Sequence, residues 1–486
     1  METETVPEAV RWRILAVLLL TIFMSLVGVS IVNVALPSIQ RALDASLSDI
    51  QWVLSGYALT FGVFLVAAGR AGDIMGRGGI FLLGVGIFTL SSLLAGLAPD
   101  ANWLNAARFV QGIGSGLLNP QGIGMIQQYF RGEERGRAFG YFGTTVGLSV
   151  AIGPVLGGVL IKLGGLQLGW RLTFLVNVPF GVLALVLGVL WFPKPLTRKI
   201  PRPSNAHARR QQGLRSLDPI GAVILGLAVL ATLFPFVESR TSPLTWLLLP
   251  LGLVLYYLWV KWEQRYARTG NSPMVDLNIF RTASFTNGTI IMTLYFLGMT
   301  SIWVLVALYI QDGNGMSALQ SGMFGVPASL LAAYMSHWAG KRVMRYGRIV
   351  VIIGLLMAIV GLVLSSAVVI LHEIGNLNVW WLMFTLSFIG VAQGLIISPN
   401  QALTLADVPL EYAGSSGAIM QTGQRIGTSV GIAVITAAVF ASLGLSSWTT
   451  ATTVGFGTIS LVVLVALWVA VRDWRDRARS DPTEPG

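Results

Sequence analysis

The first long apolar stretch of the chain, residues 14–37, reads ILAVLLLTIFMSLVGVSIVNVALP and contains no charged residue. A helix of about 20 apolar residues crosses the roughly 30 Å hydrocarbon core of a membrane with its backbone hydrogen bonds made internally. The stretch is too long for the apolar core of a signal peptide and carries no Ala-x-Ala cleavage site. We therefore expect it to form a retained transmembrane helix.

Thirteen further apolar stretches of similar length follow, which predicts an all-α integral membrane protein with fourteen transmembrane helices. Including the first stretch, the predicted spans are 14–37, 50–69, 79–98, 102–129, 137–161, 171–192, 217–237, 243–261, 284–310, 318–339, 349–371, 378–400, 411–440 and 449–471.

The composition agrees with this prediction. Of 486 residues, 54% are apolar and only 11% are charged, whereas a soluble domain has about 25% charged residues. A soluble multidomain protein is therefore excluded. The chain has no cysteine, which also excludes disulfides, thiolate metal sites and cysteine nucleophiles.

The net charge of +11 follows the predicted topology. Of the 32 Lys and Arg residues, 26 lie in alternate loops and the tails, and 4 lie in the remaining loops. Cytoplasmic loops carry such an excess of cations, so we expect both termini in the cytoplasm of a multi-pass protein of the cell membrane. Cations scattered along one membrane face do not indicate nucleic-acid binding.

An internal repeat divides the chain. The sequence GRAGDIMGRGG at 69–79 corresponds to GKRVMRYGR at 340–348 with one offset of 271, and LLNPQ at 117–121 corresponds to IISPNQ at 396–401. Two pseudo-symmetric six-helix bundles with two inserted central helices are expected, as in transporters built from parallel repeats. The predicted parts are an N-terminal bundle (1–192), a basic cytoplasmic linker (193–216), two inserted helices (217–261), a cytoplasmic loop (262–283), a C-terminal bundle (284–471) and a cytoplasmic tail (472–486).

These motifs carry a family resemblance. GRAGDIMGRGG resembles the loop signature of the major facilitator superfamily between its second and third helices, and RFVQGIGSG at 108–116 resembles its fourth-helix signature. GLSVAIGPVLGG at 147–158 is similar to the fifth-helix motif of antiporters. SIVNVALPSI at 30–39 and WRLTFLVNVPFG at 170–181 are similar to the fourteen-helix drug:proton antiporter branch, and the resemblance extends over essentially the whole chain.

Two glycine-rich motifs are candidates for a gate. An acid at the end of the second span can accept hydrogen bonds from the first turn of a facing helix and pair with the arginine that follows it. Glycines beside it allow close helix contact, and a Gly-Pro pair in the fifth span allows bending. The alternatives are a purely topogenic role for Arg70 and Arg77 and static packing of the fifth span. The gate candidates are Gly69, Gly72, Asp73, Gly76, Arg77, Gly153, Pro154, Gly157 and Gly158.

Polar residues within the spans are candidates for substrate binding or coupling. Arg108 and Arg425 fall inside spans, where a charge costs at least about 2.5–3.5 kcal/mol unless it faces a cavity or a partner. The alternatives are an arginine that extends to the headgroups and amides that only join helices. The candidates are Gly28, Asn33, Arg108, Gln111, Asn119, Gln121, Gln393, Gln421, Gln424 and Arg425.

No acid is predicted at mid-membrane. The drug:proton branch commonly has an acid in its first helix, and Gly28 stands at that place here. Two arginines without a buried acid favour an anionic, zwitterionic or neutral amphipathic substrate. Asp49, Asp73, Asp312 and His337 are the remaining titratable candidates for proton transfer.

The resemblance implies a secondary active transporter that exports amphipathic, drug-like or lipid-like organic compounds by proton-coupled alternating access. The alternative is a dedicated exporter or carrier of one anionic or neutral metabolite or lipid, with coupling other than a first-helix carboxylate. The three widely separated histidines and the absence of a Gly-x4-Gly-Lys-Ser/Thr loop argue against an enzyme or an ATP-driven pump. A receptor or scaffold is disfavoured by the repeat. No cofactor or metal, no nucleic acid, a bilayer environment and a monomer are expected.

Overall fold

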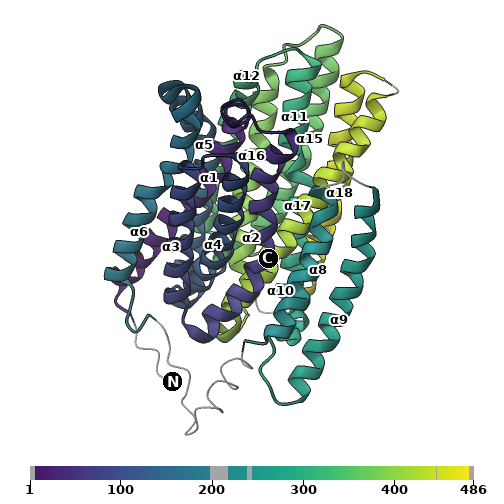
Figure 1. The fold of residues 1–486 in the computed structure, drawn as a ribbon. Helices are drawn as coiled ribbons and strands as arrows, with labels where there is room; N and C mark the ends of the chain where they lie inside the picture. The colour runs from purple at the N-terminus through teal and green to yellow at the C-terminus, as the bar shows by residue number, and fades with distance from the viewer. Residues whose placement is uncertain (1–5, 197–216, 238–242, 445, 481–486) are drawn as a thin grey trace. The chain divides into compact units, whose positions relative to one another are not determined.

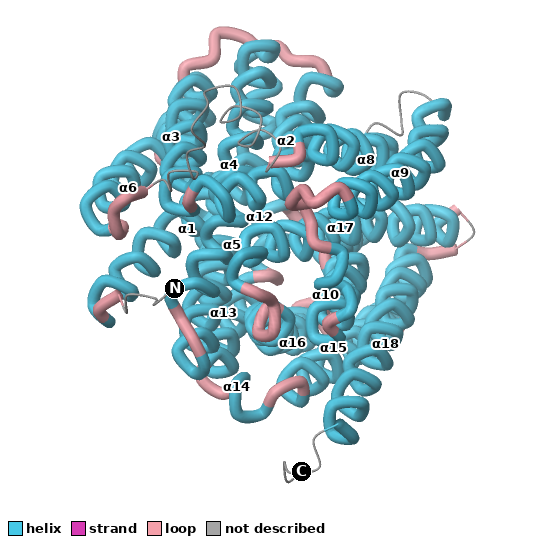
Figure 2. The backbone as a smooth tube through the Cα atoms, turned by 90° about the horizontal axis from the view of Figure 1, so that it is seen from below, coloured by secondary structure: helices cyan, strands magenta, loops and turns pink. Residues whose placement is uncertain are grey.

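The computed structural model describes residues 6–196, 217–237, 243–444 and 446–480, and these residues form only helices and loops (Figures 1 and 2). Contacts divide the chain into two compact units. The first comprises residues 1–131, 152–279 and 408–422, and the second comprises residues 132–151, 280–407 and 423–486. The predicted linker lies mostly outside the described residues, at 197–216.

The first unit contains the helices of the first repeat and the inserted pair. They are α1 (Glu8–Leu43), α2 (Leu47–Met75), α3 (Arg77–Gly96), α4 (Ala101–Tyr129), the part of α5 (Gly132–Leu175) from residue 152, α6 (Asn177–Trp191), α8 (Pro219–Val237), η1 (Pro243–Leu247), α9 (Leu248–Arg268), most of η2 (Leu277–Arg281), η4 (Leu410–Tyr412) and the part of α17 (Ala413–Leu443) up to residue 422.

The second unit contains the helices of the second repeat. They are the part of α5 up to residue 151, α10 (Ala283–Met299), α11 (Ser301–Leu308), η3 (Tyr309–Gly313), α12 (Ala318–Met323), α13 (Val326–Gly340), α14 (Val343–Tyr346), α15 (Ile349–Glu373), α16 (Trp381–Thr404), the part of α17 from residue 423, and α18 (Trp448–Ser480). Thus α5 and α17 each contribute to both compact units.

Side-chain chemistry explains how these helices begin and pack. Ser46 and Asp49 form a capping box at the start of α2, and Asp100 accepts a hydrogen bond from Trp103 N at the start of α4. Each satisfies amides that the first helical turn leaves without partners. Large apolar side chains such as Leu163 and Leu190 are 77% and 69% exposed, as expected for helices whose outer faces meet lipid rather than water.

Within the described ranges, eleven helical segments are long and apolar enough to cross a membrane. Every predicted span overlaps a helix, but several boundaries differ. The predicted break at 162–170 is reduced to a turn at Gly165, whose φ of 64° is the one non-helical position inside α5. The close approach of Gly164 to Gly169 permits this tight reversal. The predicted tail begins as helix, because α18 continues to Ser480.

Candidate functional site

A single glycine separates α2 from α3 and positions the main polar site of the first unit. Gly76 has φ 106° and ψ 122°, a conformation that residues with a Cβ rarely adopt. Its amide still donates to Gly72 O at 3.0 Å, and α3 starts at Arg77. The turn therefore places Arg77 back against the last turn of α2.

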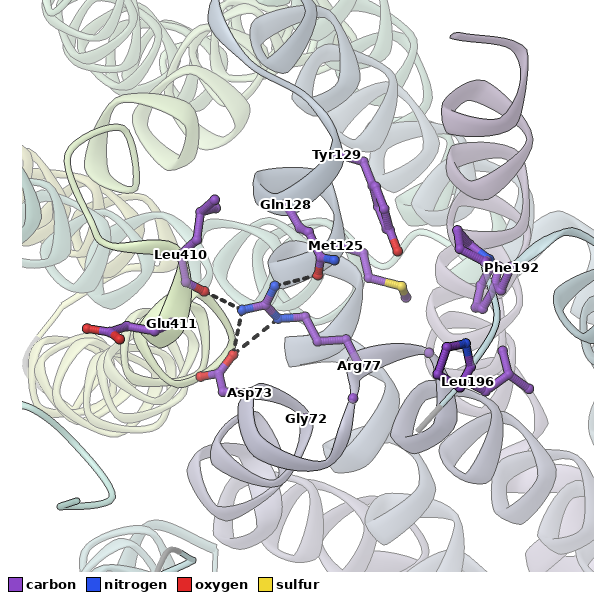
Figure 3. A pocket seen from close by; sticks show the side chains of 14 residues that line it. Gly72, Asp73, Arg77, Met125, Gln128, Tyr129, Phe192, Leu196, Leu410 and Glu411 are labelled. Carbon is purple, nitrogen blue, oxygen red and sulfur yellow. Dashed lines mark hydrogen bonds and ion pairs between the residues drawn. The ribbon is translucent and has the colours of Figure 1, made fainter. Parts of the chain in front are cut away.

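Arg77 joins three segments of the first unit (Figure 3). Its Nε and Nη2 donate to Asp73 Oδ1 at 3.1 and 2.7 Å, and its Nη1 donates to Gln128 Oε1 at 2.6 Å. Nη2 also donates to the carbonyl of Leu410 at 2.6 Å. The side chains of Arg77 and Asp73 are only 8% and 1% exposed, so the ion pair is shielded from water and its geometry matters.

Asp73 also accepts hydrogen bonds from the first turn of α17. Gly414 N donates to Oδ1 at 2.9 Å, and Ser415 N and Oγ donate to Oδ2 at 2.9 and 3.0 Å. The N-terminus of a helix carries partial positive charge and free amides, which stabilise a carboxylate. The structure thus gives Asp73 the contacts that the sequence suggested for an acid at this place.

Glycines allow the helices to approach closely here. A Cβ at Gly69 would lie 2.6 Å from Gly414 O, and a Cβ at Gly72 would overlap the side chain of Gln121. Gln121 is fully buried and donates to Ala68 O at 2.6 Å. Arg70 lies 5.9 Å from the ring of Tyr412. The whole motif is therefore packed against neighbours of the same unit and is not simply a charged loop.

A cavity of about 290 Å³ opens beside this site. Arg77 and Gln128 form its polar side, and Phe192 and Leu196 contribute to its apolar side (Figure 3). The arrangement offers contacts that can form and break, and hydrogen-bonding groups for a small molecule.

The fifth-span motif packs against α1 within the first unit. A Cβ at Gly153 would lie 2.5 Å from Ser30 Cβ, and one at Gly157 would lie 2.9 Å from Ile31 Cγ1, whereas Gly158 has open space. The helix continues through Pro154. Close packing with α1 is therefore observed, and bending during transport stays a prediction.

Arg108 is satisfied by neutral partners in the first unit. It is 1% exposed, its Nε donates to Val53 O at 2.8 Å, and its guanidinium lies 4.3 Å from the ring of Tyr57. Its Nη1 donates to Gln111 Oε1 at 2.5 Å, and Gln111 donates to Ser92 Oγ at 2.7 Å. Of the two possibilities, cavity or partner, the structure shows partners. The expectation that Arg108 lends positive charge to a substrate crevice is corrected, because its guanidinium is enclosed by packed side chains.

The other candidates differ in accessibility. Asn33 is exposed on α1, whereas Gly28 is buried, with Asn177 Nδ2 3.3 Å from where a Cβ would stand. Asn119 donates to Ser115 O at 3.1 Å. Gln393, Gln424 and Arg425 are half-buried in the second unit, and Gln421 is buried in the first. Among these candidates, the structure joins Arg108 and Gln111 directly within the first unit.

The remaining titratable candidates have different surroundings within their own units. Asp49 caps α2, Asp312 is exposed in η3, and the ring of His337 lies 5.2 Å from that of Tyr141. Among the described residues no group of three or more His, Asp or Glu could hold a metal ion. Asp49 has an evident structural role in the cap.

Sequence reasoning missed one buried ion pair, in the second unit. Arg348 Nε lies 2.7 Å from Asp473 Oδ2, and both side chains are almost completely buried. Asn287 donates to Asp473 Oδ1 at 2.7 Å, and Arg348 donates to Asn400. The repeat indicated Arg348 as the counterpart of Arg77, but Asp473 was assigned to the tail, so its pairing was not predicted.

Comparison with known proteins now adds to the geometry. The family model of the Major Facilitator Superfamily matches residues 18–432 and 288–486. The probable actinorhodin transporter of Streptomyces coelicolor is 31% identical over 90% of this chain and 74% of its own length. The puromycin resistance protein of Streptomyces alboniger is 30% identical over 96% of this chain and 92% of its own length.

A solved structure has the same fold. The human organic anion transporter MFSD10 aligns over 96% of this chain and 100% of its own with a TM-score of 0.67 at 14% identity. The Major Facilitator Superfamily consists of membrane transporters and not of enzymes. With an all-helical fold, the paired loop motifs and these matches, the chain belongs to the Major Facilitator Superfamily.

Proposed function

We propose that the protein exports amphipathic, drug-like or lipid-like organic compounds across the cytoplasmic membrane by proton-coupled alternating access. The observation that carries this proposal is the Asp73 site, in which an acid binds both Arg77 and the first turn of α17. These contacts involve a helix that continues into the second compact unit. Making and breaking these contacts would favour one conformation over another. The names of the actinorhodin and puromycin relatives support an organic substrate.

We propose fourteen transmembrane helices. Eleven segments meet a simple length and hydropathy criterion. Three more spans bring the number to fourteen. They are α4, the pair of α12 and α13, and the second of the two spans that result when residues 132–191 are divided at Gly165. The low hydropathy of α4 reflects its glycines and amides, several of which are buried against neighbouring helices. Such residues are tolerated in a transmembrane helix where protein covers them.

We propose the topology and the domains that the sequence predicts. The excess of Lys and Arg in alternate loops supports cytoplasmic termini. The repeat supports bundles at 1–192 and 284–471, with 193–216 as linker, 217–261 as inserted helices, and 262–283 and 472–486 as cytoplasmic segments. A monomer is consistent with the two repeats within one chain.

A dedicated exporter or carrier of one anionic or neutral compound is a second candidate. Gly28 favours this second candidate, because its place in α1 lacks the carboxylate of the drug:proton branch. A carboxylate there would also meet the packed side chains of Asn177 and Phe88. The charge of the substrate can no longer be argued from Arg108, whose guanidinium is enclosed. Asn33, exposed on α1, is the candidate that a substrate could reach without rearrangement within the first unit.

Asp73→Asn tests the gate. The amide keeps the size of the side chain but removes the ion pair with Arg77 and the charge at the start of α17. We expect transport of a fluorescent amphipathic compound into inverted vesicles to fall at least about tenfold, since charge-assisted hydrogen bonds are the strong ones. Asp44→Asn, in the exposed turn between α1 and α2, is the matched control and should transport normally, because Asn tolerates the φ of 47° at this position. Equal activity of Asp73→Asn and wild type would refute the gate.

Reconstitution tests the coupling and the substrate class. Purified protein in liposomes is given an imposed pH gradient and one cationic, one neutral and one anionic amphipathic compound in turn. Uptake that requires the gradient and follows its direction is the expected result. Uptake unaffected by collapsing the gradient would exclude proton coupling and leave the family assignment intact.

A further inference from the structure

An apolar groove lies in the second unit where α13, α15 and α16 meet. Its volume is about 400 Å³, and its lining contains no charged side chain. Trp338, Tyr346, Ile349 and Ile353 are among the lining residues, and the last three are 45%, 38% and 45% exposed. The groove is therefore open to the surroundings of the second unit.

The groove runs along α15. Its lining includes Ile349, at the start of that helix, and Met357, which at 1.5 Å per residue are about 12 Å apart. Val350 and Leu395 form its buried floor. An elongated apolar groove on a transmembrane helix suits a hydrocarbon chain better than a compact polar molecule.

Three cations lie in the chain segment that precedes the groove residues Tyr346 and Ile349. Lys341, Arg342 and Arg345 lie in the short segment between α13 and α15. The guanidinium of Arg342 lies 4.4 Å from the ring of Trp338, and that of Arg345 lies 5.5 Å from the ring of Tyr346. Both rings line the groove. The two aromatic walls therefore hold two positive charges at its mouth.

These cations have no acidic partner in the described part of the chain, where no ion pair includes Lys341, Arg342 or Arg345. Arg348, only three residues beyond Arg345, is by contrast buried against Asp473. The charges at the mouth are thus available to an external anion, and the groove beside them is available to an apolar chain.

We propose that this groove binds an anionic phospholipid, with one acyl chain along α15 and the phosphate against Arg342 and Arg345. Guanidinium groups bind phosphate through paired charge-assisted hydrogen bonds. Basic pockets between transmembrane helices on the cytoplasmic side are suited to anionic headgroups. A free anion would leave the groove empty, and a zwitterionic lipid would gain less from the cations.

Quenching of Trp338 fluorescence tests the proposal with the full-length protein. The protein is placed in phosphatidylcholine vesicles that contain increasing fractions of phosphatidylglycerol or phosphatidylcholine with brominated acyl chains. The signal of Trp338 is the difference between wild type and Trp338→Phe. We expect brominated phosphatidylglycerol to quench it at a several-fold lower mole fraction than brominated phosphatidylcholine. The preference should weaken as salt is added.

Charge variants provide the control. Arg342→Gln with Arg345→Gln should lower the preference for the anionic lipid by about fivefold per arginine. Arg265→Gln with Arg268→Gln removes the same amount of charge from the end of α9, and this variant should retain the preference for the anionic lipid. Ile353→Phe, which fills the groove, should reduce quenching by both lipids. Equal quenching by the two lipids in wild type, or an unchanged preference in the Arg342 and Arg345 variant, would overturn the proposal.

Competition separates the lipid from other ligands. Inorganic phosphate up to millimolar concentration should leave quenching unchanged, because it gains nothing from the apolar groove. Quenching abolished by phosphate would assign the site to a free anion. Displacement of the lipid by a transported compound at concentrations that saturate transport would assign the groove to the substrate and overturn the lipid proposal.

Discussion

Arg77 and Arg348 occupy equivalent positions in the two repeats, yet they are paired in different ways. Each follows a glycine of positive φ, Gly76 at 106° and Gly347 at 54°. Each also binds an amide on the fourth helix of its repeat, Gln128 in α4 or Asn400 in α16. The backbone turn and one partner are therefore common to both sites.

The acid is what differs. Asp73, in the last turn of α2, precedes Arg77 by four residues. The equivalent position in the second repeat is Met344, which is 36% exposed. Arg348 instead takes its acid, Asp473, from α18. One repeat has a local ion pair and the other a pair between segments distant in sequence.

This difference indicates different roles. Asp473 also accepts a hydrogen bond from Asn287, and Asn400 donates to Gly288 O at 2.8 Å. The site therefore ties α10, α15, α16 and α18 together within one unit. Asp73 is bound instead to the first turn of α17, a helix divided between the units. We infer that the Arg348 site is a permanent brace and that the Arg77 site is the one that changes during transport.

Asp473→Ala should give the largest effect on stability. It leaves the buried guanidinium of Arg348 without a counter-ion, and breaking a buried pair in this way costs about 3–5 kcal/mol. A large fall in the thermal unfolding temperature of the purified protein in detergent is the expected result. Asp476→Ala, which breaks an ion pair whose side chains are 66% and 59% exposed, should cost less than about 1 kcal/mol.

A double variant makes the comparison sharper. Arg348→Met with Asp473→Leu replaces both charges by apolar groups of similar size, and such replacement is often neutral. Recovery of most of the lost stability would support the brace, since no charge is then left buried. If Asp473→Ala unfolds no more easily than Asp476→Ala, the Arg348 site contributes no stability.

The sequence predicted the helices better than the contacts of their polar residues. Apolar stretches locate helices because hydrocarbon admits few charges, and the repeat identified Arg348 as the counterpart of Arg77. Asp473 was placed in the tail because it follows the last apolar stretch. Its burial depends on Asn287 and Arg348, which are distant in sequence and which hydropathy does not detect.

The same limit applies to Arg108 and Gly165. Sequence indicates that an arginine inside a span needs a partner, but cannot tell a crevice from the ring of Tyr57 and the carbonyl of Val53. The break predicted at 162–170 contains Gly165, but its length was overestimated because helix continues on both sides of this glycine. Glycine is common in membrane helices, so its presence alone does not show which glycine adopts a positive φ.

Gly69 and Gly340 are equivalent in the two repeats, and replacing each by alanine tests whether the Arg77 site and the Arg348 site respond alike to crowding. A Cβ at Gly69 would lie 2.6 Å from Gly414 O, and one at Gly340 would lie 2.5 Å from Gly140 Cα. Because backbone atoms must move in both cases, each alanine variant should cost about 1–3 kcal/mol of stability. Only Gly69→Ala should also reduce transport per folded molecule, because only it disturbs the first turn of α17.

Gly86→Ala is the control for this pair, because no atom lies within 4 Å of its Cβ position. It should be neutral or slightly stabilising, as alanine favours a helix over glycine. Thermal unfolding and vesicle transport are measured on the same preparations. If Gly340→Ala lowers specific transport as much as Gly69→Ala, the distinction between brace and gate fails.

Met344→Asp should give the smallest effect. It introduces the local acid of the first repeat at the equivalent place in the second, one helical turn before Arg348. At a position that is 36% exposed, the new charge should add no more than about 0.5 kcal/mol. It should also fail to restore the unfolding temperature when combined with Asp473→Ala, because the hydrogen bond between Asn287 and Asp473 stays lost. Rescue by Met344→Asp would mean that the origin of the acid is immaterial, and that the two sites differ in sequence but not in mechanical role.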